Sequence, residues 1–94
     1  MLESKLEAYF RLRVRRDLQG ISFKLAPTTI GMPDRLILTR RGMYLVELKT
    51  ETGVVAPAQR VLHERIRALG IPVAVLYGRE DVDLWVDLEE MQHG

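Results

Sequence analysis

The sequence predicts an α/β fold in which helices flank a mixed central sheet, in the order helix, strand, strand, strand, helix, strand. Three patterns indicate this fold: apolar residues that recur every four positions at the start, two strand-like segments joined by a short polar turn, and a continuous apolar run after a second helical segment. The last pattern is typical of a buried strand reached through a helical crossover, so the third and fourth strands should be parallel.

The first eighteen residues are predicted to form an amphipathic helix, because their apolar positions share one face. Glu7 borders this apolar stripe and can reach a site against which the helix packs. Gly20 marks the end of the helix, residues 21–26 suggest an edge-like strand, and residues 27–29 interrupt that strand. The stripe consists of Leu2, Leu6, Phe10, Val14 and Leu18.

Residues 35–39 and 43–49 are predicted to be the two strands of a hairpin, with the polar turn at residues 40–42. In that hairpin the numbers of facing residues sum to roughly 80, so Asp34 lies opposite the strand end that contains Glu47 and Lys49. Side chains alternate along a strand, which places Glu47 and Lys49 on one face and Val46 and Leu48 on the other.

A second helix is predicted from Pro57, which suits a first helical position, to Leu69, with Gly70 as its C-terminal cap. Gln59 lies on the apolar face of this helix and points toward the sheet. Such a glutamine usually satisfies buried backbone groups, but near a helix N-terminus it could also help to bind phosphate. The predicted apolar stripe is Val61, Leu62, Ile66 and Leu69; Arg60, Arg65 and Arg67 are expected on the outer faces, and His63 on the surface.

After this helix, residues 72–77 form a short apolar run that is typical of a buried strand. Residues 82–88 have an alternating pattern that fits either a last strand or a short helix. Trp85 lies within this pattern and is available for packing in the core or against a partner.

The length of 94 residues suits a single domain that spans residues 1–94. Because the chain has no cysteine, no signal-peptide pattern and no apolar run long enough to cross a membrane, we expect a soluble cytoplasmic protein. Residues 1–78 carry 13 lysines and arginines against 7 acids, and residues 79–94 carry one arginine against six acids. A basic body suits a protein that binds phosphate backbones, although scattered basic residues are more often ordinary solvated surface.

The candidate site is the predicted meeting point of Asp34, Glu47 and Lys49. Gly31 permits a sharp turn and Pro33 fixes its own backbone angle, so Asp34 enters its strand from a defined direction. Carboxylates and a backbone carbonyl are hard oxygen ligands that suit Mg²⁺ or Mn²⁺, and Lys49 could orient a water or stabilise negative charge. Taken singly, Glu-x-Lys on a strand is usually an exposed charge pair, and Gly-x-Pro-Asp is usually a turn.

An aspartate at the start of one strand and Glu-x-Lys on the next, within this order of elements, resembles the PD-(D/E)xK nuclease superfamily, and its VRR-NUC family is the narrower match. The resemblance covers nearly the whole chain and implies a restriction-endonuclease-like core. The residues that carry it are Glu7, Gly31-x-Pro33-Asp34, Arg35-Leu36, Glu47-x-Lys49 and Gln59.

The resemblance also implies a role for each of these residues. Asp34 and Glu47, with the main-chain carbonyl of Leu48, would bind the metal, and Glu7 would assist directly or through water. Lys49 and Gln59 would position the nucleophile or the phosphate. Glu3 is an alternative to Glu7, and the basic residues expected to contact nucleic acid are Lys24, Arg35 and Arg60.

The expected function is that of a Mg²⁺- or Mn²⁺-dependent endonuclease that hydrolyses DNA phosphodiesters. This chain looks like the small stand-alone members of the family in phage and bacteria, which resemble Holliday-junction resolvases and work as homodimers, so branched DNA such as a four-way junction is the expected substrate. Symmetric cutting of two strands needs two sites, and this chain contains one. The sheet edge and the Trp85 region are candidate dimer surfaces, and the sequence names no targeting partner.

Two alternatives stand beside this expectation. One is a nucleic-acid-binding module that keeps the nuclease fold without turnover. The other is a small interaction domain whose charges pair on its surface, for which no salt-sensitive DNA binding is expected.

Overall fold

A computed structural model describes residues 2–26 and 28–93. In these residues the sheet has the strand order β1-β2-β3-β4, with two antiparallel pairings followed by the parallel pairing of β3 with β4. The predicted restriction-endonuclease-like α/β arrangement is confirmed, with a further helix after the last strand. The elements are α1 (Glu3–Leu18), β1 (Ile21–Lys24), β2 (Arg35–Thr39), β3 (Gly42–Lys49), α2 (Pro57–Ala68), β4 (Val73–Tyr77) and α3 (Gly78–His93).

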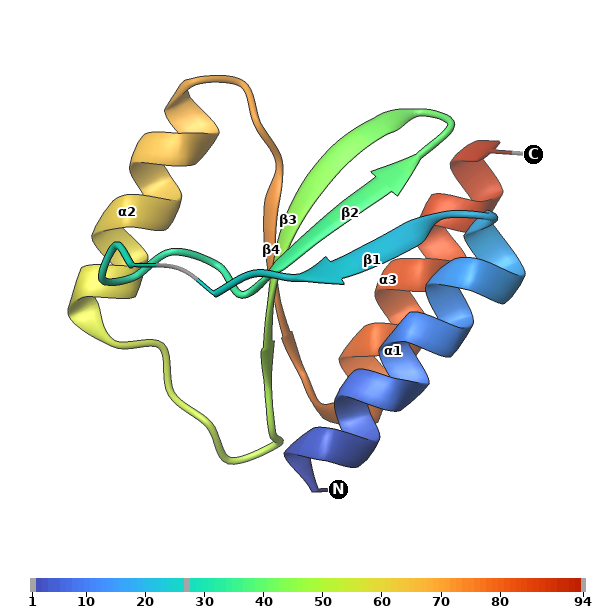
Figure 1. The fold of residues 1–94 in the computed structure, drawn as a ribbon, viewed down its shortest axis with the longest axis horizontal. Helices are drawn as coiled ribbons and strands as arrows, with labels where there is room; N and C mark the ends of the chain where they lie inside the picture. Colours follow the sequence, from blue (N-terminus) through green and yellow to red (C-terminus); the bar gives the residue numbers. More distant parts are fainter. Residues whose placement is uncertain (1, 27, 94) are drawn as a thin grey trace.

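The sheet lies between two helical layers, with α2 on one face and α1 and α3 side by side on the other (Figure 1). The larger hydrophobic cluster lies under α1 and α3 and includes Phe10, Val46 and Val86. A smaller cluster under α2 contains Leu45, Ile66 and Val73. The two faces of β3 therefore belong to different clusters, as the alternation of its side chains predicts.

The hairpin has the predicted register. Arg35 faces Val46 and Thr39 faces Gly42, so the numbers of each pair sum to 81. Val46 and Leu48 point into the larger cluster, and Glu47 and Lys49 are on the opposite face, toward α2. The strand alternation read from the sequence is therefore confirmed.

Helix α1 has the predicted apolar stripe from Leu6 to Leu18, but Leu2 precedes the helix and is 68% exposed. The helix also ends at a different residue than expected. Its C-terminal residue in the left-handed conformation is Gln19, with a φ of 49°. Gly20 is instead a position of close packing, because a Cβ atom there would lie 2.7 Å from the carbonyl oxygen of Leu38. This glycine allows β1 to leave the helix directly alongside β2.

The predicted apolar stripe of α2 was wrong in two positions. Val61 is 62% exposed and Leu69 is 79% exposed, whereas Ile66 is buried and Leu62 is half-buried. The smaller cluster on this face is centred on Leu45 in β3 and on β4, so only a narrow face of the helix is covered.

Residues 82–88 belong to a helix, which resolves the ambiguity left by their sequence pattern. Val82 and Val86 are fully buried against α1, and Trp85 packs its ring near those of Phe10 and Tyr44. Trp85 therefore belongs mainly to the core. No helix in the described part of the chain combines the length and apolar character that crossing a membrane requires.

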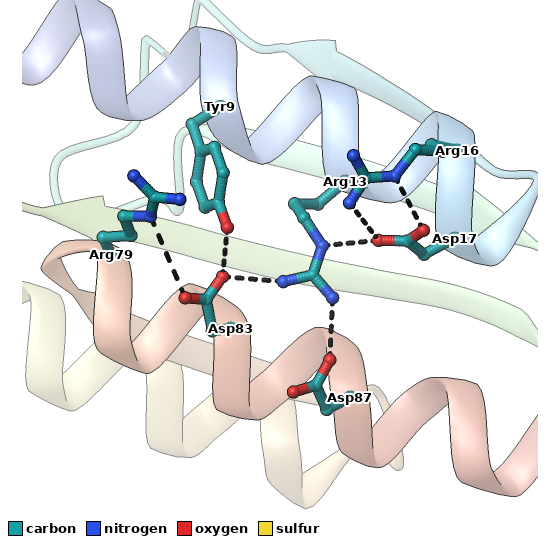
Figure 2. Close-up of polar contacts among 7 residues, drawn as sticks. All are labelled: Tyr9, Arg13, Arg16, Asp17, Arg79, Asp83 and Asp87. Carbon is teal, nitrogen blue, oxygen red and sulfur yellow. Dashed lines mark hydrogen bonds and ion pairs between the residues drawn. The ribbon is translucent and has the colours of Figure 1, made fainter.

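An ionic network also joins α1 to α3 (Figure 2). The buried guanidinium of Arg13 bonds to Asp17 at 2.5 Å, to Asp83 at 2.6 Å and to Asp87 at 2.7 Å. Hydrogen bonds from Arg16 and Arg13 lower the pKa of Asp17 to about 2. The acidic C-terminal segment thus neutralises part of the basic first helix.

Candidate functional site

The segment before β2 approaches the first turn of α2 very closely. Gly31 has a φ of +91°, and a Cβ atom on it would lie 2.7 Å from the carbonyl oxygen of Ala58. Only glycine allows both this conformation and this contact without strain. Pro33, two residues later, is fully buried. The contact at Gly31 and the burial of Pro33 together fix the backbone that precedes Asp34.

Asp34 and Glu47 are brought together by the pairing of β2 with β3. The carboxylate of Asp34 accepts a long hydrogen bond of 3.4 Å from the N–H of Leu48. Glu47 is 7% exposed and interacts with the backbone N–H of Asp34. Each carboxylate is therefore held by the other strand's backbone, and the predicted convergence of the two groups is present.

The electrostatic environment of this pair is unfavourable for two negative charges. Burial, and then the charge of Asp34, raises the pKa of Glu47 above its ordinary value. Burial likewise raises the pKa of Asp34, although the hydrogen bond from Leu48 opposes the shift. Such a pair binds a cation readily, because a positive charge relieves both the mutual repulsion and the cost of burial.

Lys49 and Gln59 complete this face of the site. The Nζ atom of Lys49 lies 3.8 Å from an oxygen of Glu47, so the ammonium group partly compensates the carboxylate. Gln59 accepts a hydrogen bond of 2.9 Å from the N–H of Ala56, which caps the start of α2. Its amide also interacts with Glu47 and lowers the pKa of that carboxyl. Gln59 thus points toward the sheet, as its position in the helix predicts, and serves both the helix and the site.

Glu7 lies nearby but has different partners. Its carboxylate is 2.9 Å from Nζ of Lys24 and 3.2 Å from a guanidinium nitrogen of Arg35. A hydrogen bond from Lys24 is the main influence that lowers the pKa of Glu7. The charge of Glu7 raises the pKa of Asp34, which places the two carboxylates within electrostatic reach. Glu3, the alternative to Glu7, is exposed in the first turn of α1.

The three basic residues expected to contact nucleic acid have different exposures. Lys24 and Arg60 are exposed. Arg35 is only 3% exposed, and its guanidinium bonds to Ser22 at 3.1 Å and to Glu7 at 3.2 Å. The expectation that Arg35 contacts nucleic acid from the surface does not fit this position, because strand alternation turns it into the α1 side of the sheet.

His63 is buried, although its sequence position predicted an exposed side chain. It was expected on the surface, yet it is 1% exposed, and its Nε2 has no hydrogen-bond partner among the described residues. Burial lowers the pKa of His63, while an interaction with the backbone of Gly31 opposes that shift. The signal was available, because His63 follows Gln59 by one helical turn and shares its inward face.

The residues fit a metal of the magnesium type by the chemistry of their donors. Among residues 2–26 and 28–93, no group of three or more histidine, aspartate or glutamate side chains could hold a metal ion, so Glu7 does not form a single cluster with Asp34 and Glu47. Mg²⁺ commonly uses one or two carboxylates together with waters and substrate phosphates. The two paired carboxylates meet that requirement, and the main-chain carbonyl of Leu48 is the candidate third ligand.

Arg67, predicted on an outer face, connects two elements of the fold. Its guanidinium donates to the carbonyl of Val73 at 2.9 and 3.1 Å and also pairs with Glu64. Arg67 therefore fastens the end of α2 to the start of β4. Arg65 is exposed, as predicted.

Comparison with known proteins identifies the family. Neither a scan of protein-family models nor a search of curated proteins gives a match. A solved structure titled "VRR_NUC domain" is 32% identical to this chain with a TM-score of 0.81, and the match covers 90% of this chain and 94% of that one. Identity at this level over nearly the full length of both chains, on the same fold, shows common membership: this chain is a nuclease-fold domain and belongs to the VRR-NUC family.

Proposed function

We propose that this protein is a Mg²⁺- or Mn²⁺-dependent endonuclease that hydrolyses the phosphodiester bonds of DNA. The observation that carries the proposal is the pair of carboxylates of half-buried Asp34 and buried Glu47 beside Lys49. A pair of this kind, only partly compensated by the lysine, is costly to the fold and serves cation binding directly. The family supports nuclease chemistry in general.

In this proposal Asp34, Glu47 and the carbonyl of Leu48 hold the metal. When bound, the metal polarises a phosphoryl oxygen and lowers the pKa of a bound water. Lys49 donates hydrogen bonds to the attacking water or to the developing charge on the phosphate. Gln59 orients the same region from α2, because its amide already interacts with Glu47.

Glu7 has a supporting part in the proposal. It is held by Lys24 and Arg35, so its negative charge is largely compensated. From this position it assists through a water molecule, and it also fixes Lys24 at the border of the site. Lys24 and Arg60 remain the proposed nucleic-acid contacts among the residues first considered.

The proposed substrate is branched DNA such as a four-way junction, cut by a homodimer. Two strands of opposite polarity are cut symmetrically when two sites are related by a twofold axis. The described residues contain one paired-carboxylate site, so a second copy of the chain supplies the second.

The test uses labelled four-way junction, flap, linear duplex and single-stranded DNA, each with Mg²⁺, Mn²⁺ or EDTA. Paired symmetric cuts in the junction, lost with EDTA, are expected of the wild-type protein. Lys49→Ala should slow cleavage by about 10²- to 10³-fold, the usual effect of removing one group that stabilises developing charge. Arg65→Ala, on the outer face of α2, is the matched control and should cut normally. Junction binding without any metal-dependent cut would favour the non-catalytic module.

A further inference from the structure

The arginines of α1 fall into two groups with opposite surroundings. Arg13 and Arg16 are bound by aspartates, in the network that Figure 2 shows. Arg11 and Arg15 are exposed, and neither forms a hydrogen bond or ion pair with another residue in the described ranges 2–26 and 28–93. Because they are four positions apart, they lie one turn from each other on the same side of the helix.

These two unpaired arginines line a groove between α1 and β1. One hollow of about 430 Å³ has Arg11, Arg15 and Ser22 in its wall. A second hollow of about 450 Å³ contains Arg11 and Ser22 again, and adds Lys24 and Arg35. The two hollows share Arg11 and Ser22, so they are adjacent parts of this groove beside α1 and β1.

The second hollow lies near the paired carboxylates, although they do not line it. Its lining includes Glu7 and Lys24, whose charges both interact with that of Asp34. The exposed cations of the groove are Arg11, Arg15 and Lys24, and its carboxylate, Glu7, is paired with Lys24 and with the buried Arg35. The small side chains of Ser4, Ala8 and Ser22 leave room for a ligand, and the apolar Leu12, Ile21 and Phe23 also line the hollows. A basic groove beside the candidate site is complementary to a polyanion.

We propose that this groove binds the phosphodiester backbone of one nucleic-acid strand, from Arg15 past Arg11 to the site at Asp34. The inference rests on the proposed nuclease function and adds the path of the substrate. Arg11 and Arg15 act on phosphates, so they position the strand without reading its sequence. The pairing of Arg13 and Arg16 with acids has a consequence here, because it removes competing positive charge from the neighbouring face of the helix.

The test measures DNA binding in EDTA, where no metal-dependent cleavage takes place. Fluorescence anisotropy gives the association constant of a labelled junction between about 50 and 200 mM salt. For the double variant Arg11→Ala with Arg15→Ala, the slope of log K against log salt should become shallower by about 2, since each lost phosphate contact removes about 0.9. The matched control, Arg16→Ala with Arg65→Ala, removes the same charge outside the groove and should change the slope by less than half as much.

Cleavage by the same variants separates this inference from the proposed function. With Mg²⁺, the groove variant should lose rate at low substrate concentration and keep its rate at saturation, because the carboxylate site is intact. Equal changes in the slope of log K against log salt for the two double variants would overturn the groove proposal, even if the wild-type protein cuts DNA. If the wild-type protein never cuts DNA but the slope changes only in the groove variant, the groove proposal is supported and the nuclease proposal is rejected. Unchanged denaturation midpoints establish that both variants are folded.

Discussion

At the scale of single residues, the candidate site is a place where the proposed function opposes stability. Glu47 is buried and Asp34 is half-buried; burial raises the pKa of each, and the charge of Asp34 raises that of Glu47 further. A raised folded-state pKa means that the protonated form is favoured in the folded protein. The contribution of these two carboxyls to folding stability is therefore complete below their ordinary pKa values of 3.8 and 4.5. It is lost as the pH rises through their raised pKa values in the folded protein.

Removing either charge should stabilise the metal-free protein. Asp34→Asn or Glu47→Gln keeps the shape and an acceptor oxygen but ends the repulsion, so we expect the free energy of unfolding at pH 7 to rise by about 0.5–2 kcal/mol. Urea denaturation in EDTA at several pH values measures the effect. The advantage over wild type should shrink as the pH falls below the ordinary values of 4.5 and 3.8, because protonation of the wild-type carboxyls also ends the repulsion. A variant that is less stable than wild type at pH 7 would contradict the assignment of strain to this pair.

The same residues show how far the sequence predicts a site. Asp34, Glu47 and Lys49 were located because strand register and alternation are set by the backbone. The partners of Glu7 were not predicted, because they depend on which helix face meets which strand, and a single sequence does not specify that packing. The burial of His63 was missed although its spacing from Gln59 indicated it.

At the scale of elements, the site depends on the contact between the segment before β2 and the first turn of α2. Gly31 lies against Ala58 and Gln59, and the backbone of Gly31 also meets the ring of His63. Asp34 and Gln59 come from different elements, and this contact sets their relative position. The hairpin alone would supply the carboxylates without the glutamine.

Gly31→Ala should separate the effect of this contact from the effect of backbone conformation. Gly31 and Gly70 have similar φ values, +91° and +87°, but a Cβ atom on Gly70 would meet nothing within 4 Å. Gly70→Ala should therefore lower the free energy of unfolding by only about 1–2 kcal/mol, the penalty for placing an alanine in the left-handed conformation. Gly31→Ala should cost at least about 1 kcal/mol more, because Ala58 must shift, and it should also slow cleavage. Equal losses of stability with normal cleavage would show that the contact is unimportant.

Elements differed in how well the sequence predicted them. The hairpin was placed to within one residue, with Gly42 in the strand instead of the turn, because its turn is short and its register follows from the count of residues. The segment at residues 82–88 was ambiguous because its apolar residues fit both a strand and a helix. Burial decides between them: Val82 and Val86 are fully buried, whereas Leu84, which would share their face in a strand, is 61% exposed.

At the scale of the whole molecule, the first and last helices form one layer, fastened by Arg13. Replacing this buried arginine takes one partner from each of Asp17, Asp83 and Asp87. For Arg13→Met we expect a loss of about 3 kcal/mol and a fall in Tm of roughly 10–20 °C for a domain of this size. Arg16→Met, exposed and bonded to Asp17 alone, should cost no more than about 0.5 kcal/mol. Thermal denaturation of both variants measures the loss of stability. A similarly small loss in each would show that Arg13 does not hold the two helices together.

The pairing of α1 with α3 also fixes the order of events during synthesis. Leu6, Phe10 and Val14 of α1 need Val82 and Val86 as neighbours, and about 60 residues separate the two helices. At roughly 5–20 residues per second, the ribosome takes about 3–12 s to make that interval. Until then the apolar face of α1 is open to other proteins, so the period of greatest risk of aggregation is set by translation and not by the folding step itself.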